Sequence, residues 1–325
     1  MALFLRNTDL RQVGAGMAGA ARLPLVLALL LTGCTYMLRA LRWQYLLLPI
    51  GRVRFATALT TTLIGFAATA LLPARAGELL RPYLLARKEG LSATAAFATV
   101  IVERLLDTLT VLVLFATYLL AFDPGTARAD EATFVRIKMG GALAAGVCLA
   151  ALVLLFFVAG RPALLVRFES ALTRRLPHGP AARVSRLLQT FSEGLGIVRQ
   201  PRRLAMALML SLPLWLSIAG GIWLVTRAFQ IQMPFAGSFV LMALLVVGVA
   251  VPTPGAVGGF HYFYRLGVTG FFGAPGDRAV GAALVLHAIS FVPVAVAGVL
   301  LLTHEGMSLT RLGALARTER AEGPA

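Results

Sequence analysis

Long, uninterrupted apolar runs dominate the hydrophobic pattern of this chain of 325 residues. Two of these runs, residues 139–160 and 279–303, contain no formally charged side chain. A helix rises about 1.5 Å per residue, so about 20 such residues cross a hydrocarbon core about 30 Å thick. The pattern therefore predicts an all-α polytopic membrane protein. It excludes a soluble protein, whose segments would alternate between apolar and polar faces.

Seven apolar segments are expected to form helices. Five are long enough to span the bilayer, namely residues 23–43, 91–122, 139–160, 204–229 and 279–303. The other two, residues 55–72 and 235–251, each end in a break that contains proline and glycine. Since proline cannot continue a helix and glycine weakens it, the chain is expected to turn at both breaks.

Both breaks are interpreted as the tips of re-entrant helical hairpins. The ends of residues 55–90 are basic on both sides, so this segment is expected to enter the membrane from the cytoplasm and return to it. Residues 235–272 are expected to do the same from the opposite side. Non-helical backbone at membrane depth is tolerated only where protein or a water-filled cavity covers it. A covered cavity is therefore predicted at the two tips.

The net charge of +16 comes from 28 arginines and only two lysines against 14 acids. In a soluble protein this balance would indicate nucleic-acid binding. In a membrane protein, basic residues gather in cytoplasmic loops and attract anionic lipid. Residues 161–203, with nine arginines and two glutamates, are therefore assigned to the cytoplasm, as is the C-terminal tail. An anionic membrane surface is expected as a partner, and nucleic acid is not.

A basic edge at the end of the first span supports the same orientation. Arg39, Arg42, Arg52 and Arg54 occur there without an acid, and we assign them to the cytoplasmic side. Residues 184–198 carry apolar side chains at helical spacing beside basic ones, which predicts an amphipathic helix at the membrane surface.

The order of spans and breaks predicts one membrane domain, residues 1–325, that contains an inverted repeat. Residues 23–122 and residues 204–303 each consist of a span, a hairpin and a span, and the two sets have opposite orientation. Residues 139–203 connect them, and residues 304–325 form the tail. Inverted repeats with paired broken helices are typical of secondary transporters, whose substrates bind near the midplane.

Six of the charged residues between positions 75 and 107 are expected to lie inside the membrane: Arg75, Glu78, Arg81, Glu103, Arg104 and Asp107. A charged side chain at the bilayer centre costs roughly 2.5–3.5 kcal/mol. These residues therefore either form an ion-pair network that holds the first hairpin in place, or bind a ligand phosphate. Buried ion pairs contribute little stability, and guanidinium suits phosphate, which favours ligand binding.

The breaks supply further candidates. A helix that begins near Gly77 directs free N–H groups toward the tip, and the second break provides an opposing gate. His261 and His287 could have either a structural or a functional role. The predicted substrate-binding residues are Arg75, Gly77, Glu78, Arg81, Glu103, Arg104, Asp107, Pro252, Pro254, Gly255, Gly258 and His261.

Catalytic and cofactor motifs are lacking in the sequence. It contains no GxSxG, HExxH, paired CxxC or Walker A pattern, and Cys34 and Cys148 lie apart in apolar segments. Neither a metal, a cofactor nor catalysis is therefore expected. Two alternatives to transport remain open: an intramembrane enzyme that acts on polyprenyl-linked sugars, and a non-transporting scaffold of an envelope-lipid pathway.

Four stretches of the chain resemble the lysylphosphatidylglycerol synthase transmembrane, flippase-like family. They are LLPARAGELLRPYLL at 71–85, VERLLD at 102–107, PTPGAVGGF at 252–260 and LHAISFVP at 286–293. The resemblance implies translocation of a lipid with a large polar headgroup, in the known case an aminoacylated phosphatidylglycerol. His261 stands where members of the family usually carry an acid, so headgroup selectivity does not transfer from the family.

We therefore expect a flippase of the bacterial inner membrane that binds a phospholipid or another lipid-linked substrate. The chain ends 22 residues after residue 303, so an aminoacyl-transferase domain and synthesis of an aminoacyl lipid are not expected. Transport without a nucleotide site implies a gradient or mass action as the driving force. The lipid, the coupling ion and the oligomeric state, a homo-oligomer included, stay open.

Overall fold

A computed structural model describes residues 10–72, 75–121, 178–251 and 253–305, together with eight helical positions between residues 139 and 154. These residues form helices and short connections and contain no strand. The elements are α2 (Leu10–Ala18), α3 (Arg22–Leu47), α4 (Phe55–Leu71), α5 (Gly77–Glu89), α6 (Ala93–Ala121), α9 (His178–Gly194), η3 (Leu195–Ile197), α10 (Pro201–Ala228), α11 (Gly237–Ala250), η4 (Pro254–Ala256), α12 (Gly259–Phe272) and α13 (Gly276–His304).

The all-helical prediction is confirmed, and the helices begin and end close to the expected positions. Among the described helices, α3, α10 and α13 are long and apolar enough to cross a membrane. Helix α6 has 29 residues, as many as α13, but carries three charged residues in its middle. Helices α4 and α11 are apolar and shorter. The span expected at residues 139–160 lies largely outside the described residues.

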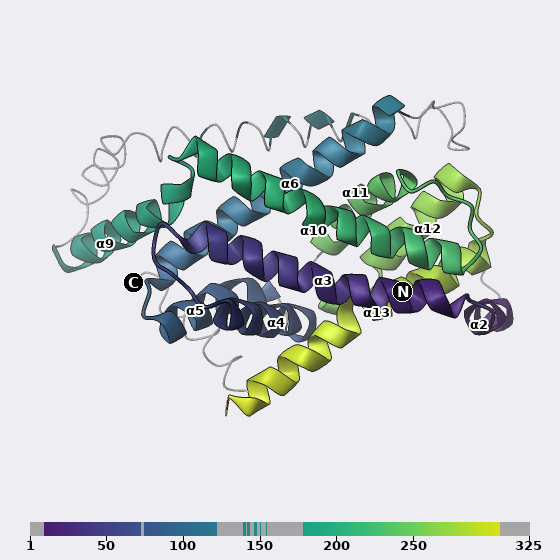
Figure 1. Ribbon diagram of the computed structural model, residues 1–325, viewed down its shortest axis with the longest axis horizontal. Coiled ribbons are helices and arrows are strands. Elements are labelled where there is room, and N and C mark those ends of the chain that lie inside the picture. The colour runs from purple at the N-terminus through teal and green to yellow at the C-terminus, as the bar shows by residue number, and fades with distance from the viewer. Residues whose placement is uncertain are drawn as a thin grey trace.

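Helices α3 and α10 are antiparallel and run side by side along the length of the molecule (Figure 1). At one end, the Ala21 N–H donates to the Ala228 carbonyl over 3.0 Å. Nearer the middle, the hydroxyls of Thr35 and Ser217 are 2.7 Å apart. Helices α4 and α5 lie toward one end of this pair, and α11 and α12 toward the other (Figure 1).

Helices α4 and α5 form one closely packed pair, and α11 and α12 form a second. In each pair the helices meet through two glycines. A Cβ added to Gly77 would overlap the Gly65 carbonyl oxygen, and a Cβ added to Gly259 would overlap that of Gly248. The absence of side chains at these four positions is therefore what allows the backbones to approach so closely.

The breaks between the paired helices face each other in the middle of the molecule. Both contain residues in the left-handed region, with φ of 55° at Arg75 and 60° and 57° at Gly255 and Ala256. Only glycine adopts this region readily, and strained backbone of this kind is concentrated at functional sites. A Cβ on Gly255 would lie 3.6 Å from the Ala70 carbonyl oxygen at the end of α4. The two breaks are thus neighbours.

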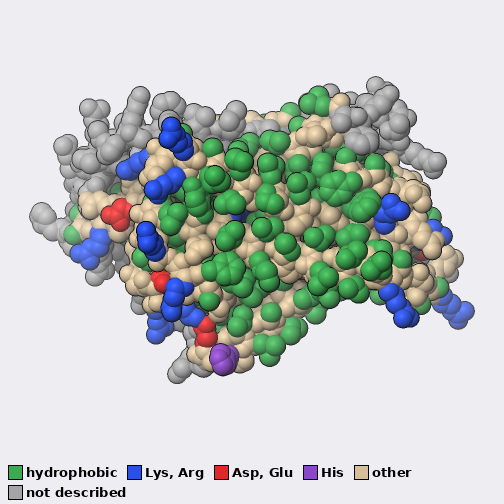
Figure 2. Space-filling view, viewed as in Figure 1, with side chains coloured by type: hydrophobic (Ala, Val, Ile, Leu, Met, Phe, Trp, Pro, Cys, Tyr) green, Lys and Arg blue, Asp and Glu red, His purple; other side chains and the backbone are tan. Residues whose placement is uncertain are grey.

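On the face that Figure 2 shows, apolar side chains cover the middle, and Lys and Arg gather toward both ends. Leu30, Met209 and Leu300 on α3, α10 and α13 are all more than 60% exposed. Exposed apolar area on this scale marks a contact surface, and three long apolar helices identify that surface as one suited to lipid.

The amphipathic helix expected at residues 184–198 is present as α9 and η3. Leu195 and Ile197 are fully buried, and a Cβ on Gly194 would meet Ala95 and Ala98 of α6. Leu187, on the apolar stripe of the same segment, is 53% exposed. The end of this segment is therefore anchored against α6, while its middle presents an apolar side chain outward.

Candidate functional site

A cavity of about 640 Å³ lies between the two helix pairs, and helices α3 to α6 and α10 to α13 all contribute to its lining. Its charged side chains come from the first half of the chain, from α3, α5, α6 and the first break. Helices α11 and α13 supply a mostly apolar wall, which consists of Met242, Leu245, Val246, Val249, Ala250, Leu286, Ile289, Ser290, Phe291 and Val294. The cavity therefore has a charged side and an apolar side.

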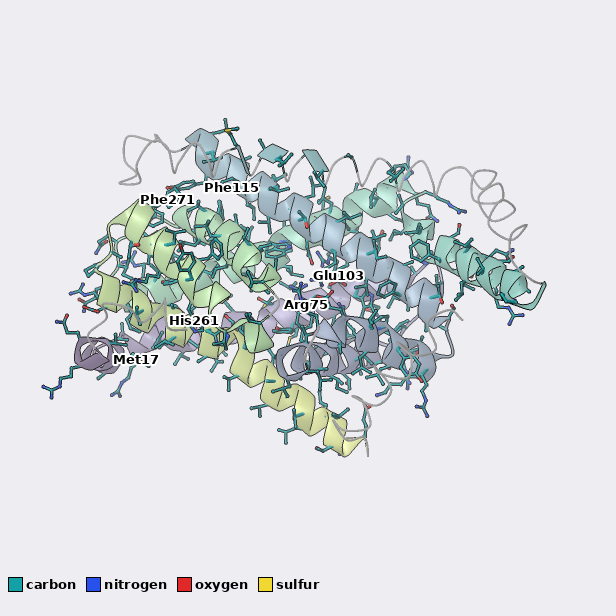
Figure 3. All side chains as sticks on the ribbon, turned by 180° about the vertical axis from the view of Figure 1, so that it is seen from behind. Met17, Arg75, Glu103, Phe115, His261 and Phe271 are labelled. Atoms are coloured by element: carbon teal, nitrogen blue, oxygen red, sulfur yellow. The ribbon has the colours of Figure 1, made fainter. Side chains whose placement is uncertain are left out.

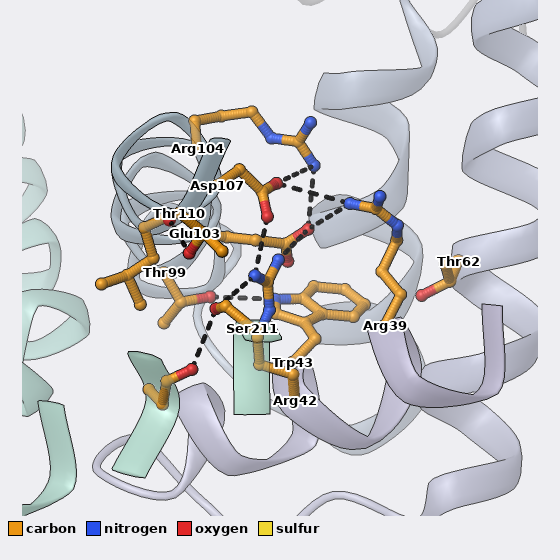
Figure 4. A network of polar contacts seen from close by, with 12 residues as sticks. Arg39, Arg42, Trp43, Thr62, Thr99, Glu103, Arg104, Asp107, Thr110 and Ser211 are labelled. Carbon is orange, nitrogen blue, oxygen red and sulfur yellow. Dashed lines mark hydrogen bonds and ion pairs between the residues drawn. The ribbon is translucent and has the colours of Figure 1, made fainter. Parts of the chain in front are cut away.

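Glu103 of α6 is the centre of the charged side. Its Oε1 lies 2.8 Å from Arg104 Nη2, 3.0 Å from Arg81 Nη1 and 3.4 Å from both Arg39 Nη1 and Arg42 Nη2. The Glu103 side chain is fully buried. Figure 4 shows Glu103 and Asp107 on one helix, facing the guanidinium groups of α3. One carboxylate thus faces four guanidinium groups from three helices.

Asp107 lies one helical turn further along α6 and faces the same side. Its Oδ1 accepts hydrogen bonds from Arg42 Nη1 over 2.7 Å and from the Trp215 indole N–H over 2.9 Å. Its Oδ2 lies 3.4 Å from Arg39 Nη1 and 3.6 Å from Arg104 Nη2. Charge-assisted bonds of this kind are stronger than neutral ones, so Asp107 fixes α3 and α10 against α6.

Further contacts hold two of the arginines in place. Arg81 donates from Nε to the Thr62 hydroxyl over 3.1 Å, and its guanidinium lies 3.8 Å from the centre of the Trp43 ring. Arg42 donates to the Ser211 hydroxyl over 2.7 Å. A guanidinium over an indole face is attracted by the ring quadrupole. Arg42 and Arg81 are therefore positioned by polar and aromatic neighbours as well as by the carboxylates.

The cluster of Arg39, Arg42, Arg81, Arg104, Glu103 and Asp107 contains four guanidinium groups and two carboxylates. Several of its buried nitrogens have no hydrogen-bond acceptor among the described residues: Nε of Arg39, Arg42 and Arg104, Nη2 of Arg42 and Nη2 of Arg81. Arg39, Arg81 and Arg104 line the cavity, and Arg42 and Glu103 lie behind them. The Oε2 of Glu103 also has no hydrogen-bond donor among the described residues. Because guanidinium groups outnumber carboxylates in the cluster, this wall is suited to an anion.

Arg75 and Glu78 lie at the cavity but outside this cluster. Arg75 Nε is 3.3 Å from Glu78 Oε1, and the two side chains are 43% and 37% exposed. Figure 3 shows Arg75 and Glu103 in the central part of the molecule. The sequence grouped Arg75, Glu78, Arg81, Glu103, Arg104 and Asp107 in one set, either as an ion-pair network or as a phosphate site. The structure joins four of them, and it pairs Arg75 with Glu78 instead.

Arg39 and Arg42 were not predicted as site residues. The sequence assigned them to a cytoplasmic edge, and this assignment is wrong because both are buried inside α3, facing α6. Their spacing of three places them on one helix face. The apolar pattern also continues beyond them through Leu46 and Leu47. Together these two signals could have indicated that the arginines lie within the helix rather than after it.

The second break contributes backbone rather than charge to the lining. Gly255 lines the cavity, and its carbonyl oxygen lies 2.7 Å from His287 Nε2. Gly258 donates from its N–H to Nδ1 of His261 over 3.3 Å, and His261 is only 2% exposed. Among the described lining residues, neither Gly258 nor His261 appears. The structure therefore places these two residues behind the break.

Two further residues of this break, Pro252 and Pro254, were predicted to bind substrate. Pro252 lies outside the described residues, and Pro254 is described only as the first residue of η4. His261 and His287 form a ring pair, with centroids 4.6 Å apart.

Gly77 lines the cavity at the start of α5, beside the charged wall. Within the described residues, no group of three His, Cys, Asp or Glu side chains could hold a metal ion.

Comparison with known proteins identifies the family. A family model described as the lysylphosphatidylglycerol synthase TM region matches residues 1–298, which include the cavity and both breaks. No curated protein matches the chain. The family match and the long apolar helices together show a membrane protein with a lipid-related role. The chain belongs to the family of the lysylphosphatidylglycerol synthase transmembrane region.

Proposed function

We propose that this protein moves a lipid with a phosphate-containing headgroup across the bacterial inner membrane. One observation carries the proposal: a single cavity has arginines on one side and apolar residues on the other. A lipid has the same two parts, a charged headgroup and hydrocarbon chains. Arg39, Arg81 and Arg104 would engage the phosphate, because guanidinium stays charged and binds phosphate oxygens through a planar fork.

The lengths of the paired helices support re-entrant hairpins. Helix α5 has 13 residues and α11 and α12 have 14 each. At about 1.5 Å per residue they extend only about 20 Å, which is less than the hydrocarbon core of about 30 Å. We propose that α4 and α5 enter from the cytoplasm, that α11 and α12 enter from the other side, and that α6 spans the membrane with α3, α10 and α13.

The same arrangement supports an inverted repeat. Helices α3 and α10 are antiparallel, and each is followed by a glycine-packed helix pair and then by a long helix. In transporters built this way, substrates bind where the broken helices meet, and the halves move against each other. The cavity lies between the two breaks, as this mechanism requires.

Exchange of ion pairs supplies a mechanism of release. While a phosphate is bound, its oxygens would replace part of the contact between the arginines and Glu103 or Asp107. After the lipid leaves, the carboxylates would recover these contacts, so the arginines are never left without an anion. This exchange keeps the difference in free energy between the loaded and empty cavity small, which rapid release requires.

The proposal is tested by the movement of fluorescent phospholipids in proteoliposomes, with dithionite reduction of the label in the outer leaflet as the readout. The protein is expected to accelerate exchange, and Arg81→Ala and Arg104→Ala are expected to slow it about tenfold or more, as loss of a charged hydrogen bond predicts. Arg87→Ala, which removes an exposed arginine from the same helix as Arg81, should have no effect.

The same reconstitution distinguishes the two alternatives from transport. An intramembrane transferase would convert an added polyprenyl-linked sugar into a covalent product that mass spectrometry detects. A scaffold would yield neither exchange nor product with any lipid tested. Exchange that persists unchanged in both Arg81→Ala and Arg104→Ala would overturn the assignment of the site.

A further inference from the structure

The charges around the cavity do not balance. In the cluster, four guanidinium groups face two carboxylates, which leaves an excess of two positive charges. Arg75 and Glu78 also line the cavity, and as a pair they leave this excess unchanged. No other Asp, Glu, Lys or Arg is found among the described lining residues. The cavity therefore presents a net charge of +2.

Local geometry shows where the excess charge is available. Arg81 is 3% exposed, and its Nη2 has no hydrogen-bond acceptor among the described residues although its Nη1 and Nε are both bonded. Arg104 donates from Nη2 to Glu103, and its Nε has no acceptor. Both side chains line the cavity. Arg81 and Arg104 thus border the cavity, and the protein does not bond all the N–H groups of either guanidinium.

On the basis of the proposed function, we infer that the lipid bound here carries at least two negative charges on phosphate, as a phosphomonoester or a diphosphate does. A phosphodiester lipid carries one charge and would leave one positive charge uncompensated. A headgroup with a free amine would add positive charge to a wall already in excess. Because the second pKa of a phosphomonoester is about 6, this group is doubly charged above neutral pH.

The apolar wall indicates that the phosphate is attached to a hydrocarbon chain. Helices α11 and α13 present aliphatic and phenyl side chains opposite the arginines, so a free phosphate would leave this half of the cavity without a partner. Phosphatidate and polyprenyl phosphates or diphosphates share the required chemistry. These lipids differ only in their hydrocarbon chains, and an apolar wall offers no charged group that would select one chain over another.

Binding of matched lipids to the purified full-length protein in detergent tests the inference. Phosphatidate is compared with phosphatidylglycerol of the same acyl chains at pH 8.5, and farnesyl diphosphate with free pyrophosphate, the probe without a chain. The affinity for phosphatidate is expected to exceed that for phosphatidylglycerol about tenfold, the effect of one charge-assisted hydrogen bond. Pyrophosphate is expected to bind more weakly than farnesyl diphosphate.

Two variants shift the charge in opposite directions at partly exposed positions of the wall. Arg104→Gln removes one positive charge and should reduce the ratio of phosphatidate to phosphatidylglycerol affinity about tenfold. Glu78→Gln releases Arg75 from its partner and should raise the affinity for phosphatidate. Misfolding cannot produce changes of opposite sign in two monodisperse variants. Arg87→Gln, outside the cavity, should leave both affinities unchanged.

Equal affinity for the two phospholipids, or the same direction of change in Arg104→Gln and Glu78→Gln, would overturn the inference. Lipid exchange measured in parallel separates this result from the proposed function. If exchange of phosphatidylglycerol depends on Arg81 but binding shows no preference for a doubly charged lipid, the proposed transport stands and the inferred requirement for two negative charges is refuted. Preference for phosphatidate without any exchange supports this requirement and refutes transport.

Discussion

Arg42 and Asp107 form a buried ion pair in which Nη1 lies 2.7 Å from Oδ1, although 65 positions separate the two residues in the sequence. The same Arg42 nitrogen donates to Ser211, and the same Asp107 oxygen accepts from Trp215. Since the last two residues belong to α10, the pair connects α3 and α6 of the first half of the chain to the second half.

Removal of both members of this pair should destabilise the protein by less than the sum of the two single removals. Asp107→Asn leaves Arg42 without its closest carboxylate, and loss of one partner from a buried pair costs about 3–5 kcal/mol. Arg42→Gln should have a comparable cost, and the double variant should recover about 0.5–3 kcal/mol as coupling between the residues. Reversible unfolding in mixed micelles measures the four free energies of the cycle.

Glu193→Gln is the control for the loss of a carboxylate, because Glu193 is an exposed residue of α9. Its effect on the free energy of unfolding should stay within about 0.5 kcal/mol. Strict additivity of the Arg42 and Asp107 substitutions would show that the two side chains do not interact in the folded protein.

The helices and both breaks were predictable because they depend on local sequence. Apolar runs of about 20 residues define spans, and proline with glycine interrupts a helix wherever the fold places it. The close packing of Gly65 on Gly77 and of Gly248 on Gly259 was not predicted. Such contacts depend on which helices meet, and no local pattern specifies that.

The arginines of the site show the limit of reading charge along the chain. Arg81, Arg104 and their acids were predicted because they stand inside apolar segments. Arg39 and Arg42 were misassigned because basic residues near the end of a span usually mark a cytoplasmic edge. Helix α3 continues for about two turns after Arg39, and carboxylates on α6 pair with both arginines. Tertiary packing therefore overrides the usual placement of basic residues at a membrane edge.

Alanine at Gly65 or Gly77 should separate α4 from α5. A Cβ added to Gly65 would overlap Arg81 Cβ, and one added to Gly77 would overlap the Gly65 carbonyl oxygen. Overpacking of this kind costs about 1–3 kcal/mol. Alanine favours a helix by up to about 1 kcal/mol relative to glycine, so a loss of stability would identify crowding rather than propensity as the cause. Thermal unfolding in detergent measures the effect.

Gly33→Ala provides the matched control, because Gly33 lies in helix α3 with no atom within 4 Å of an added Cβ. It should leave stability unchanged or raise it slightly. A loss at Gly33 as large as that at Gly65 or Gly77 would contradict the crowding explanation.

Labelling of single cysteines from one side of the membrane tests the re-entrant arrangement. In a background with Cys34 and Cys148 replaced by alanine, cysteines at Arg52 and Arg87, beyond the two ends of the first helix pair, should react with an impermeant thiol reagent only from the cytoplasm. Cysteines at Gln232 and Arg278, beyond the ends of the second pair, should react only from the opposite side.

Each position is labelled again after the membrane is permeabilised, which shows that the cysteine is reactive when reached. If Arg52 and Arg87 were labelled from different sides, the first pair would cross the membrane completely. The inverted repeat would then have to be abandoned, because the two halves would no longer have matching topologies.

Lysine at position 81 should not support lipid exchange at the wild-type rate, although it preserves the positive charge of Arg81. Arg81 donates from Nη1 to Glu103 and from Nε to Thr62 while its guanidinium covers the Trp43 ring. A lysine ammonium is a point charge without the planar fork, so it cannot satisfy these three contacts together. Loss of one charge-assisted hydrogen bond, about 1.5–3 kcal/mol, predicts that lipid exchange slows by about tenfold or more.

The control variant Arg87→Lys, on the same helix, should exchange lipid at the wild-type rate. Wild-type exchange by Arg81→Lys would mean that the site requires only a positive charge at this position and that the orientation of the guanidinium plays no part.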